Sequence, residues 1–233
     1  MSDEPTFQSW IGSSTPDSIT VGELDLPSEV MGHLTLTELA YLLVTRRRPT
    51  EPQRRMFDAC LVALADHGLT PSALATRLTH TGAPEAVQAS VAAGLLGAGS
   101  VFLGPTGDTA EFLAATLAGQ EPDADLAALA EEAVTARRAA GLRVPGLGHP
   151  VHKLEDPRTP RLYELAEQEG LLGPHLRLLR EVAAAHERQS GKRLAINGAG
   201  AAGAALADLD LPPAVIRGVV LIGRTAGLVA HVA

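Results

Sequence analysis

The chain is a succession of alanine- and leucine-rich segments that are separated by glycine and proline. Hydrophobic residues make up 45% of its 233 residues, whereas aromatic residues make up only 3%. Alanine and leucine are the strongest helix formers, so this pattern favours a mainly α fold. Helix-starting and helix-stopping residues divide the chain into ten expected helices. These cover residues 35–47, 51–67, a short stretch from 71, 84–96, 107–118, 123–140, 159–169, 175–189, 197–209 and 212–233.

The first residues differ from the rest of the chain. Residues 1–19 are polar and rich in serine, threonine and proline, and we expect a flexible segment there. Residues 19–26 alternate between apolar and polar side chains, which predicts a short strand or hairpin arm. The acidic, polar beginning is unlike a signal peptide.

Charge and cysteine content narrow the functional classes. The net charge of −8 argues against a nucleic-acid partner, which requires a basic face. It also means that an anionic substrate would need a local cluster of cations. The single cysteine, Cys60, excludes an intrachain disulfide and fits a reducing cytoplasm, and its apolar surroundings predict a buried packing residue. We find no apolar run of about 20 residues that would span a membrane, so we expect a cytoplasmic protein.

The segment from Val144 to Arg158 reads VPGLGHPVHKLEDPR and concentrates the chain's polar chemistry. Its glycines allow backbone to come close to a ligand, and its prolines restrict the loop to few conformations. Imidazoles and cations follow at His149, His152, Lys153 and Arg158. This combination suits a small polycarboxylate beside a larger, flatter group, although an ordinary surface loop is the alternative.

The same segment resembles the signature of the citrate synthase superfamily. Three further landmarks resemble that family in the right order: ADHG at residues 65–68, KRLAIN at 192–197 and IGRTAG at 222–227. The short length and the Asp-His-Gly form are most similar to the citryl-CoA lyase branch, including the lyase module of ATP citrate lyase.

The resemblance implies a multi-helical fold over residues 20–233, with a large and a small helical lobe. The large lobe would hold residues 20–109 and 191–233, and the small lobe residues 110–190. Members of the family form homodimers or higher oligomers, which implies the same for this chain. Its Ala/Gly-rich segments 84–98 and 197–211 suit close helix–helix contact.

The resemblance also implies a reaction and a set of residues. Citryl-CoA would be cleaved to acetyl-CoA and oxaloacetate by a reverse Claisen reaction, with the CoA thioester as substrate and no permanently bound cofactor. His149 would be catalytic and, with His67, Arg158 and Arg224, would bind the substrate. The CoA-binding residues would be Val144, Pro145, Gly146, Leu147, Gly148 and Lys153.

The residues themselves also bear on the role of Arg224 and on metal binding. Arg224 stands alone in an apolar helix, where a charge is expensive unless it is paired by a ligand or by an internal salt bridge. The histidine spacings indicate no metal site, because His149 and His152 have no third ligand nearby in the sequence.

The chain departs from the family pattern at two positions. Ala199 stands where the resemblance places the catalytic aspartate, and Phe102 stands where synthases have a further histidine. Three interpretations remain: another acid substitutes, the substrate is a different CoA thioester, or the chain is a CoA-ester-binding paralogue with little catalysis. Candidate substitutes by residue type are Asp108, Glu155, Asp156 and Asp208. A citrate or methylcitrate synthase, an acyltransferase that condenses an acyl-CoA with a 2-oxo acid, is the other enzymatic alternative.

Overall fold

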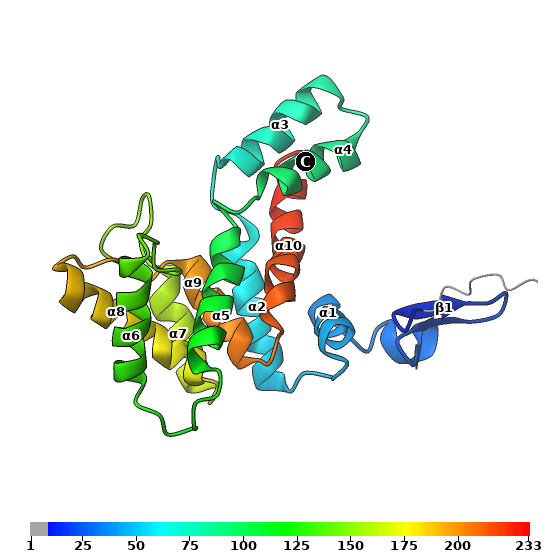
Figure 1. Cartoon of the computed structure of the whole chain (residues 1–233). Helices are drawn as coiled ribbons and strands as arrows, with labels where there is room; N and C mark the ends of the chain where they lie inside the picture. Colours follow the sequence, from blue (N-terminus) through cyan, green and yellow to red (C-terminus); the bar gives the residue numbers. More distant parts are fainter. Residues whose placement is uncertain (1–8) are drawn as a thin grey trace, which may run out of the picture. The chain divides into compact units, whose positions relative to one another are not determined.

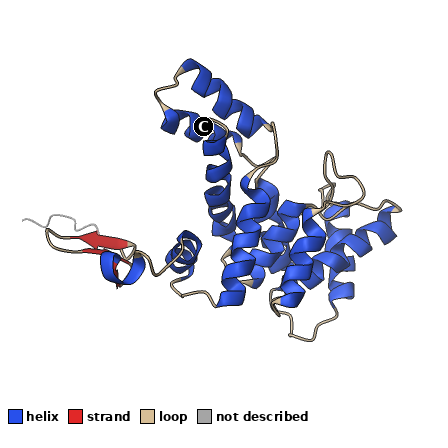
Figure 2. Cartoon of the chain, turned by 180° about the vertical axis from the view of Figure 1, so that it is seen from behind, coloured by secondary structure: helices blue, strands red, loops and turns tan. Residues whose placement is uncertain are grey.

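The structure, a computed structural model, describes residues 9–233, and most of this range is helical (Figures 1 and 2). The chain divides into two compact units, residues 1–54 and 55–233. The predicted flexible segment falls partly on residues 1–8, which lie outside the described part. Beyond them, residues 12–14 already form a strand. The predicted lobe boundaries near residues 110 and 190 stay a prediction.

The first unit contains the only strands among residues 9–233 (Figure 2). They form an antiparallel sheet in the order β1-β2-β3, with bounds Gly12–Ser14, Ile19–Val21 and Leu24–Asp25. The predicted hairpin arm is therefore confirmed, with Gly22 at its turn in a left-handed conformation. A π-helical turn, η1 (Leu26–Val30), and helix α1 (Leu36–Thr45) follow. Thr35 and Glu38 form a capping box at the start of α1, where the sequence predicted a helix to begin.

The second unit is entirely helical in its regular structure. Each expected helix is present within a few residues of its predicted ends. Their bounds are α2 Glu51–Ala65, which begins at the end of the first unit, α3 Pro71–Gly82, α4 Val87–Gly97, α5 Gly104–Leu117, α6 Leu126–Ala139, α7 Arg158–Gln168, α8 Pro174–Ser190, α9 Gly198–Asp208 and α10 Pro213–Ala230.

Helix α9 is the central helix of this unit. It packs against α5, α7, α8 and α10 (Figure 1). Most of its residues are buried. Two glycines permit this close packing. A Cβ on Gly200 would overlap the backbone of Gly146, and a Cβ on Gly203 would overlap the carbonyl of Thr106. The predicted close contact of the 197–211 segment is thus confirmed.

Helix α10 approaches α2 through two glycines. A Cβ on Gly223 would overlap the carbonyl oxygen of Leu61, and one on Gly227 would overlap that of Ala65. Within residues 9–233, α10 is the one helix long and apolar enough to cross a membrane. The sequence search for an apolar run of about 20 residues did not find this helix, which packs against α3, α4, α5 and α9 and carries a buried arginine.

Candidate active site

The carboxyl end of α2 brings together three of the predicted substrate-binding residues. Arg158 donates from Nη1 to the carbonyl oxygen of Ala63 at 3.2 Å, and Arg224 donates from Nε to that of Leu64 at 3.0 Å. The last carbonyls of a helix have no partner within it and carry partial negative charge, so they attract cations. His67 follows two residues after the helix ends. A feature of local helix chemistry therefore positions two arginines and a histidine from distant parts of the chain.

His149 joins this group from the loop that precedes α7. Its Nε2 lies 3.2 Å from Nε2 of His67, and the two rings meet edge to face. The Nδ1 of His149 accepts hydrogen bonds from the backbone N–H groups of Val151 and His152 at 3.1 and 3.0 Å. The neutral ring must then carry its proton on Nε2, which makes His149 a donor toward the site.

Burial favours the neutral form of both of these histidines. Burial lowers the pKa of His67 below its usual value, and the positive charge of Arg158 lowers it further. Burial also lowers the pKa of His149, and the opposing effect of Asp156 does not compensate for it. A neutral Nε2–H group suits donation to a carbonyl or hydroxyl oxygen.

His152 adds a third imidazole to the cluster, so His149 and His152 lack a third ligand only along the sequence and not in space. The third ligand that the sequence lacked near His149 and His152 is His67, and the nitrogens of all three rings lie within 4.8 Å. The tautomer of His149 nevertheless disfavours a cation. Metal-bound histidines normally donate from their second nitrogen, whereas Nδ1 of His149 accepts, so metal binding at Nε2 would leave an anionic ring.

Arg158 is engaged by a carboxylate of its own loop. Asp156, fully buried, accepts from Nε and Nη2 of Arg158 at 3.0 and 2.7 Å and from the backbone N–H of Gly198 at 2.8 Å. Burial raises the pKa of Asp156, but these hydrogen bonds outweigh it and hold the pKa well below its usual value. The charge of Arg158, a predicted substrate-binding residue, is therefore neutralised by Asp156 in this structure. Asp156 itself is too acidic to serve as the substitute proton carrier.

Arg224, unlike Arg158, is not paired with a carboxylate of the described residues. It is 6% exposed, and no carboxylate of residues 9–233 lies within ion-pair distance of it. The predicted alternative of an internal salt bridge is therefore wrong. Burial lowers the pKa of Arg224, and the negative charge of Asp66 raises it in part. A buried cation without an ion pair indicates a place for an anionic ligand.

The loop at residues 144–148 is held by the segment before α9. Gly148 donates to the carbonyl of Ala195, while Asn197 donates from its backbone to Gly146 and from its side chain to Gly148. Among the described residues, the N–H and C=O groups of Leu147 have no hydrogen-bond partner and are available to a ligand.

The two loop glycines play different parts. Gly146 and Gly148 both have positive φ, at 81° and 83°. The space beside Gly146 is filled by Thr109 and Leu179, so the absence of a Cβ at this glycine permits their close packing. A Cβ on Gly148 would meet only Leu194, at 4.0 Å. The CoA-binding assignment of Val144, Pro145, Gly146, Leu147, Gly148 and the exposed Lys153 stays a prediction.

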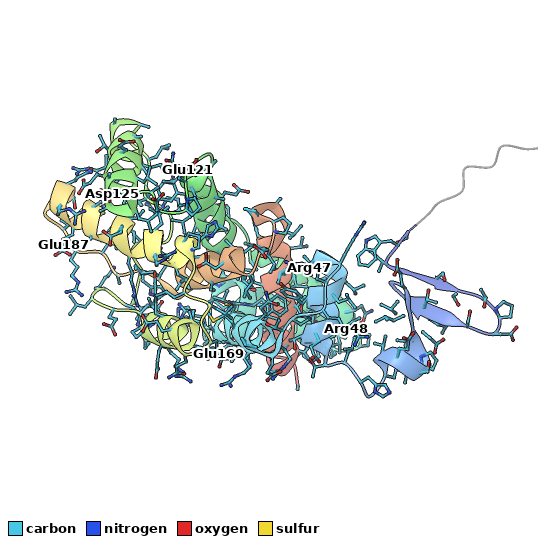
Figure 3. All side chains as sticks on the ribbon, turned by 90° about the horizontal axis from the view of Figure 1, so that it is seen from below. Arg47, Arg48, Glu121, Asp125, Glu169 and Glu187 are labelled. Atoms are coloured by element: carbon cyan, nitrogen blue, oxygen red, sulfur yellow. The ribbon has the colours of Figure 1, made fainter. Side chains whose placement is uncertain are left out.

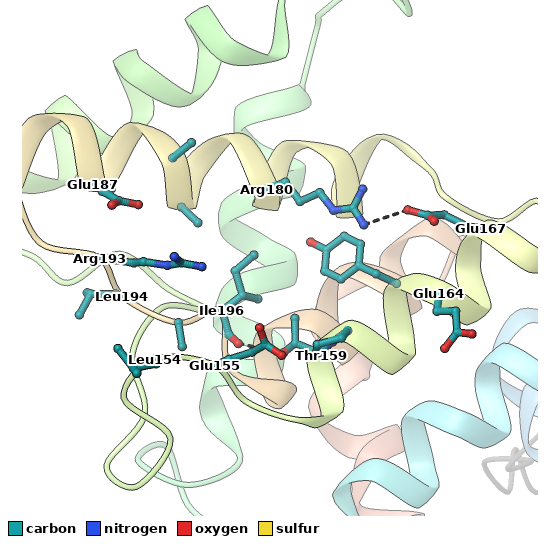
Figure 4. A pocket seen from close by; sticks show the side chains of 15 residues that line it. Leu154, Glu155, Thr159, Glu164, Glu167, Arg180, Glu187, Arg193, Leu194 and Ile196 are labelled. Carbon is teal, nitrogen blue, oxygen red and sulfur yellow. Dashed lines mark hydrogen bonds and ion pairs between the residues drawn. The ribbon is translucent and has the colours of Figure 1, made fainter.

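A separate cavity of about 480 Å³ lies between α7, α8 and residues 193–196 (Figure 4). None of the three histidines lines it. Glu155, Glu164, Glu167 and Glu187 face it with only two arginines, of which Arg180 is paired with Glu167 at 2.9 Å. Further acidic side chains, including Glu121 and Asp125, are exposed on the same unit (Figure 3). This excess of negative charge makes the cavity a poor site for the phosphates of CoA.

These observations define a helical protein in which two histidines and two arginines gather at the carboxyl end of α2. The chain belongs to the citrate synthase family, because residues 22–233 match the family described as "Citrate synthase, C-terminal domain". No curated protein sequence matches it significantly.

Solved structures show the same fold. Citryl-CoA lyase from Hydrogenobacter thermophilus is 31% identical, with a TM-score of 0.87 over 97% of this chain and 85% of that one. ATP citrate lyase from Methanothrix soehngenii, in complex with citrate and coenzyme A, is 20% identical with a TM-score of 0.82, over 100% of this chain and 39% of that one. An aspartate-to-alanine variant of ATP citrate lyase from Methanosaeta concilii, in complex with (3S)-citryl-CoA, is 20% identical with a TM-score of 0.81 and the same coverage.

Proposed function

We propose that this protein is a citryl-CoA lyase-type enzyme that cleaves a citryl-CoA-type thioester to acetyl-CoA and oxaloacetate. The observation that carries the proposal is the unpaired, buried Arg224 beside His67 and His149 at the end of α2. The similarity to a citryl-CoA lyase over nearly the whole chain supports the same assignment.

The chemistry of each side chain suggests its role in the reaction. Arg224 pairs with a substrate carboxylate, which compensates its buried charge. The Nε2–H of His149 donates to the oxygen that is a hydroxyl in the substrate and a carbonyl in oxaloacetate, and stabilises the charge that develops there. His67, just after the end of α2, contacts a second carboxylate of the substrate. The free backbone groups of Leu147, with Lys153, contact the CoA moiety.

The structure bears differently on the two alternatives, the condensation reaction and the CoA-ester-binding paralogue. Phe102 replaces the further histidine of synthases and is 44% exposed, which weighs against the condensation reaction. Ala199, in the first turn of α9, cannot carry a proton, which favours a CoA-ester-binding paralogue. The complex of citryl-CoA with an aspartate-to-alanine variant of a relative is consistent with such binding.

The test is cleavage of citryl-CoA in the presence of EDTA, with oxaloacetate release followed through malate dehydrogenase and NADH. Binding of a CoA ester is titrated in parallel, and Ala199→Asp is compared with the unmodified protein. We expect cleavage by the unmodified protein. Binding without cleavage, with activity in Ala199→Asp, would instead establish the paralogue. Binding of no CoA ester to either protein would contradict the proposal.

His149→Ala tests the site, with His33→Ala as control because His33 is exposed in the first unit. We expect citrate affinity to fall in the first variant alone.

We further propose a cytoplasmic homodimer or higher oligomer, in which exposed apolar side chains such as Leu74, Leu78 and Leu96 would be covered. The mass measured by light scattering tests the oligomeric state.

A further inference from the structure

His152 is the least engaged of the three clustered histidines. Its ring stacks on that of His149, with 4.5 Å between centroids and 29° between planes, and lies 5.9 Å from that of His67. Its backbone N–H is bound to His149, but among residues 9–233 its ring nitrogens have no hydrogen-bond partner. They are also not fully enclosed, so a ligand in the cluster can reach them.

The carboxylates that sequence reasoning offered as substitutes for the missing aspartate are occupied or misplaced. Asp156 is bound to Arg158 and Gly198. Asp208 accepts from His175 and from the backbone of Leu176 at the start of α8. Glu155 lines the separate cavity, and Asp108 is exposed on α5. None of the four offers an unengaged carboxylate to the histidine cluster.

Asp66, which the sequence reasoning did not consider, is also engaged. It accepts from the backbone N–H of Gly68 and lies 2.9 Å from Nε2 of His231. The unengaged proton-carrying group in the cluster is therefore an imidazole.

We propose that His152 carries the proton that the family's aspartate carries elsewhere, so that it is a catalytic residue of this enzyme. The proposal rests on the proposed lyase function. Histidine takes up and releases protons near neutral pH, as a general acid–base group must.

One imidazole is sufficient for the reaction. The hydroxyl oxygen and the thioester methylene are bonded to the same carbon, so one ring nitrogen can serve both. Neutral His152 accepts the hydroxyl proton, the C–C bond breaks, and its electron pair moves into the thioester enolate while the oxygen becomes the carbonyl of oxaloacetate. Protonated His152 then gives the same proton to the methylene carbon, which becomes the methyl group of acetyl-CoA. No further reactant is consumed.

The surroundings of His152 set the conditions for this role. The rings of His67 and His149 face it, burial lowers the pKa of both, and the charge of Arg158 is compensated by Asp156. Lys153 is the neighbouring cation on its own loop. His149 holds the substrate oxygen with its Nε2–H, which leaves proton transfer to the ring stacked on it.

The test compares His152→Gln with the unmodified protein, with His186→Gln on α8 as control. We expect kcat for citryl-CoA cleavage to fall by about 100-fold or more in His152→Gln, the usual size of a general acid–base contribution. KM and CoA-ester affinity should change by less than about threefold, because glutamine keeps the size and polarity of the side chain.

The outcomes separate this proposal from the proposed function. Cleavage at similar rates by the unmodified protein and His152→Gln would overturn the role of His152 and keep the lyase. Cleavage only after Ala199→Asp would show that His152 does not replace the aspartate, although the pocket is retained. A lost kcat together with lost CoA-ester binding would also overturn the proposal, because it would indicate a structural role. If no protein binds or cleaves the thioester, both proposals fail.

Discussion

The buried surroundings of Arg224 are the strongest indication that the ligand is an anion. A cation that is 6% exposed and has no ion pair is expensive to bury, so replacing it with an apolar side chain of similar length should not weaken the fold. For Arg224→Met we expect an unchanged or slightly higher free energy of unfolding. Citrate affinity should fall by about 10- to 100-fold, as loss of a hydrogen bond to a charged group implies. Urea denaturation and calorimetric titration measure the two effects.

Arg217→Met is the matched control for this prediction, because Arg217 lies on the same helix and is exposed. Both measurements should be unaffected in it. If citrate binds Arg224→Met as tightly as the unmodified protein, Arg224 does not pair with a carboxylate of the ligand.

Asp156 connects the starts of α7 and α9 through one carboxylate, and its pKa makes the connection dependent on pH. Because its folded pKa is depressed, its stabilising effect is present above the pKa of the unfolded chain, about 3.9, and is lost as the pH falls below it. We expect Asp156→Asn to lower the free energy of unfolding by about 2–4 kcal/mol at pH 7, since Arg158 is left without its partner. The difference should shrink as the pH falls from about 4 toward 2.

Urea denaturation at pH 7, 4 and 3 checks this dependence, with Glu155→Gln as control because Glu155 is exposed beside Asp156. A difference that stays constant over this range would mean that the Asp156 carboxylate does not stabilise the fold through its charge.

At the level of elements, the packing of α10 on α2 positions Arg224. A Cβ on Gly227 would overlap the carbonyl oxygen of Ala65, whereas a Cβ on the exposed Gly218 of the same helix would meet nothing within 4 Å. Alanine is the better helix former by about 1 kcal/mol, so Gly218→Ala should raise the melting temperature by a few degrees. Gly227→Ala should lower the melting temperature and weaken citrate binding, because the helices must separate. Calorimetric melting and a citrate titration compare the two, and equal effects would refute the packing argument.

At the scale of the whole molecule, the helices were predictable because their signals are local. Thr35 caps α1, and Pro71 and Pro213 begin α3 and α10 as expected. The strand at residues 12–14 was missed because it is short and lacks an alternating pattern. The site residues His67, His149, Arg158 and Arg224 came from the family resemblance, and the structure places them together. The engagement of Arg158 by Asp156 was not foreseen, although the Asp-Pro-Arg sequence at a helix start carries the signal.

The sequence by itself determined the helical class, the ends of most helices, the buried Cys60 and the chemical types available for a site. Only the tertiary structure decided which of these groups meet. His67 and His149 are 82 residues apart, and Arg224 binds a carbonyl 160 residues away. Helix signals act within a few residues, whereas such encounters depend on glycine contacts and helix-end carbonyls that bring distant segments together. The same packing determined which charges remain unpaired, and therefore where a ligand can bind.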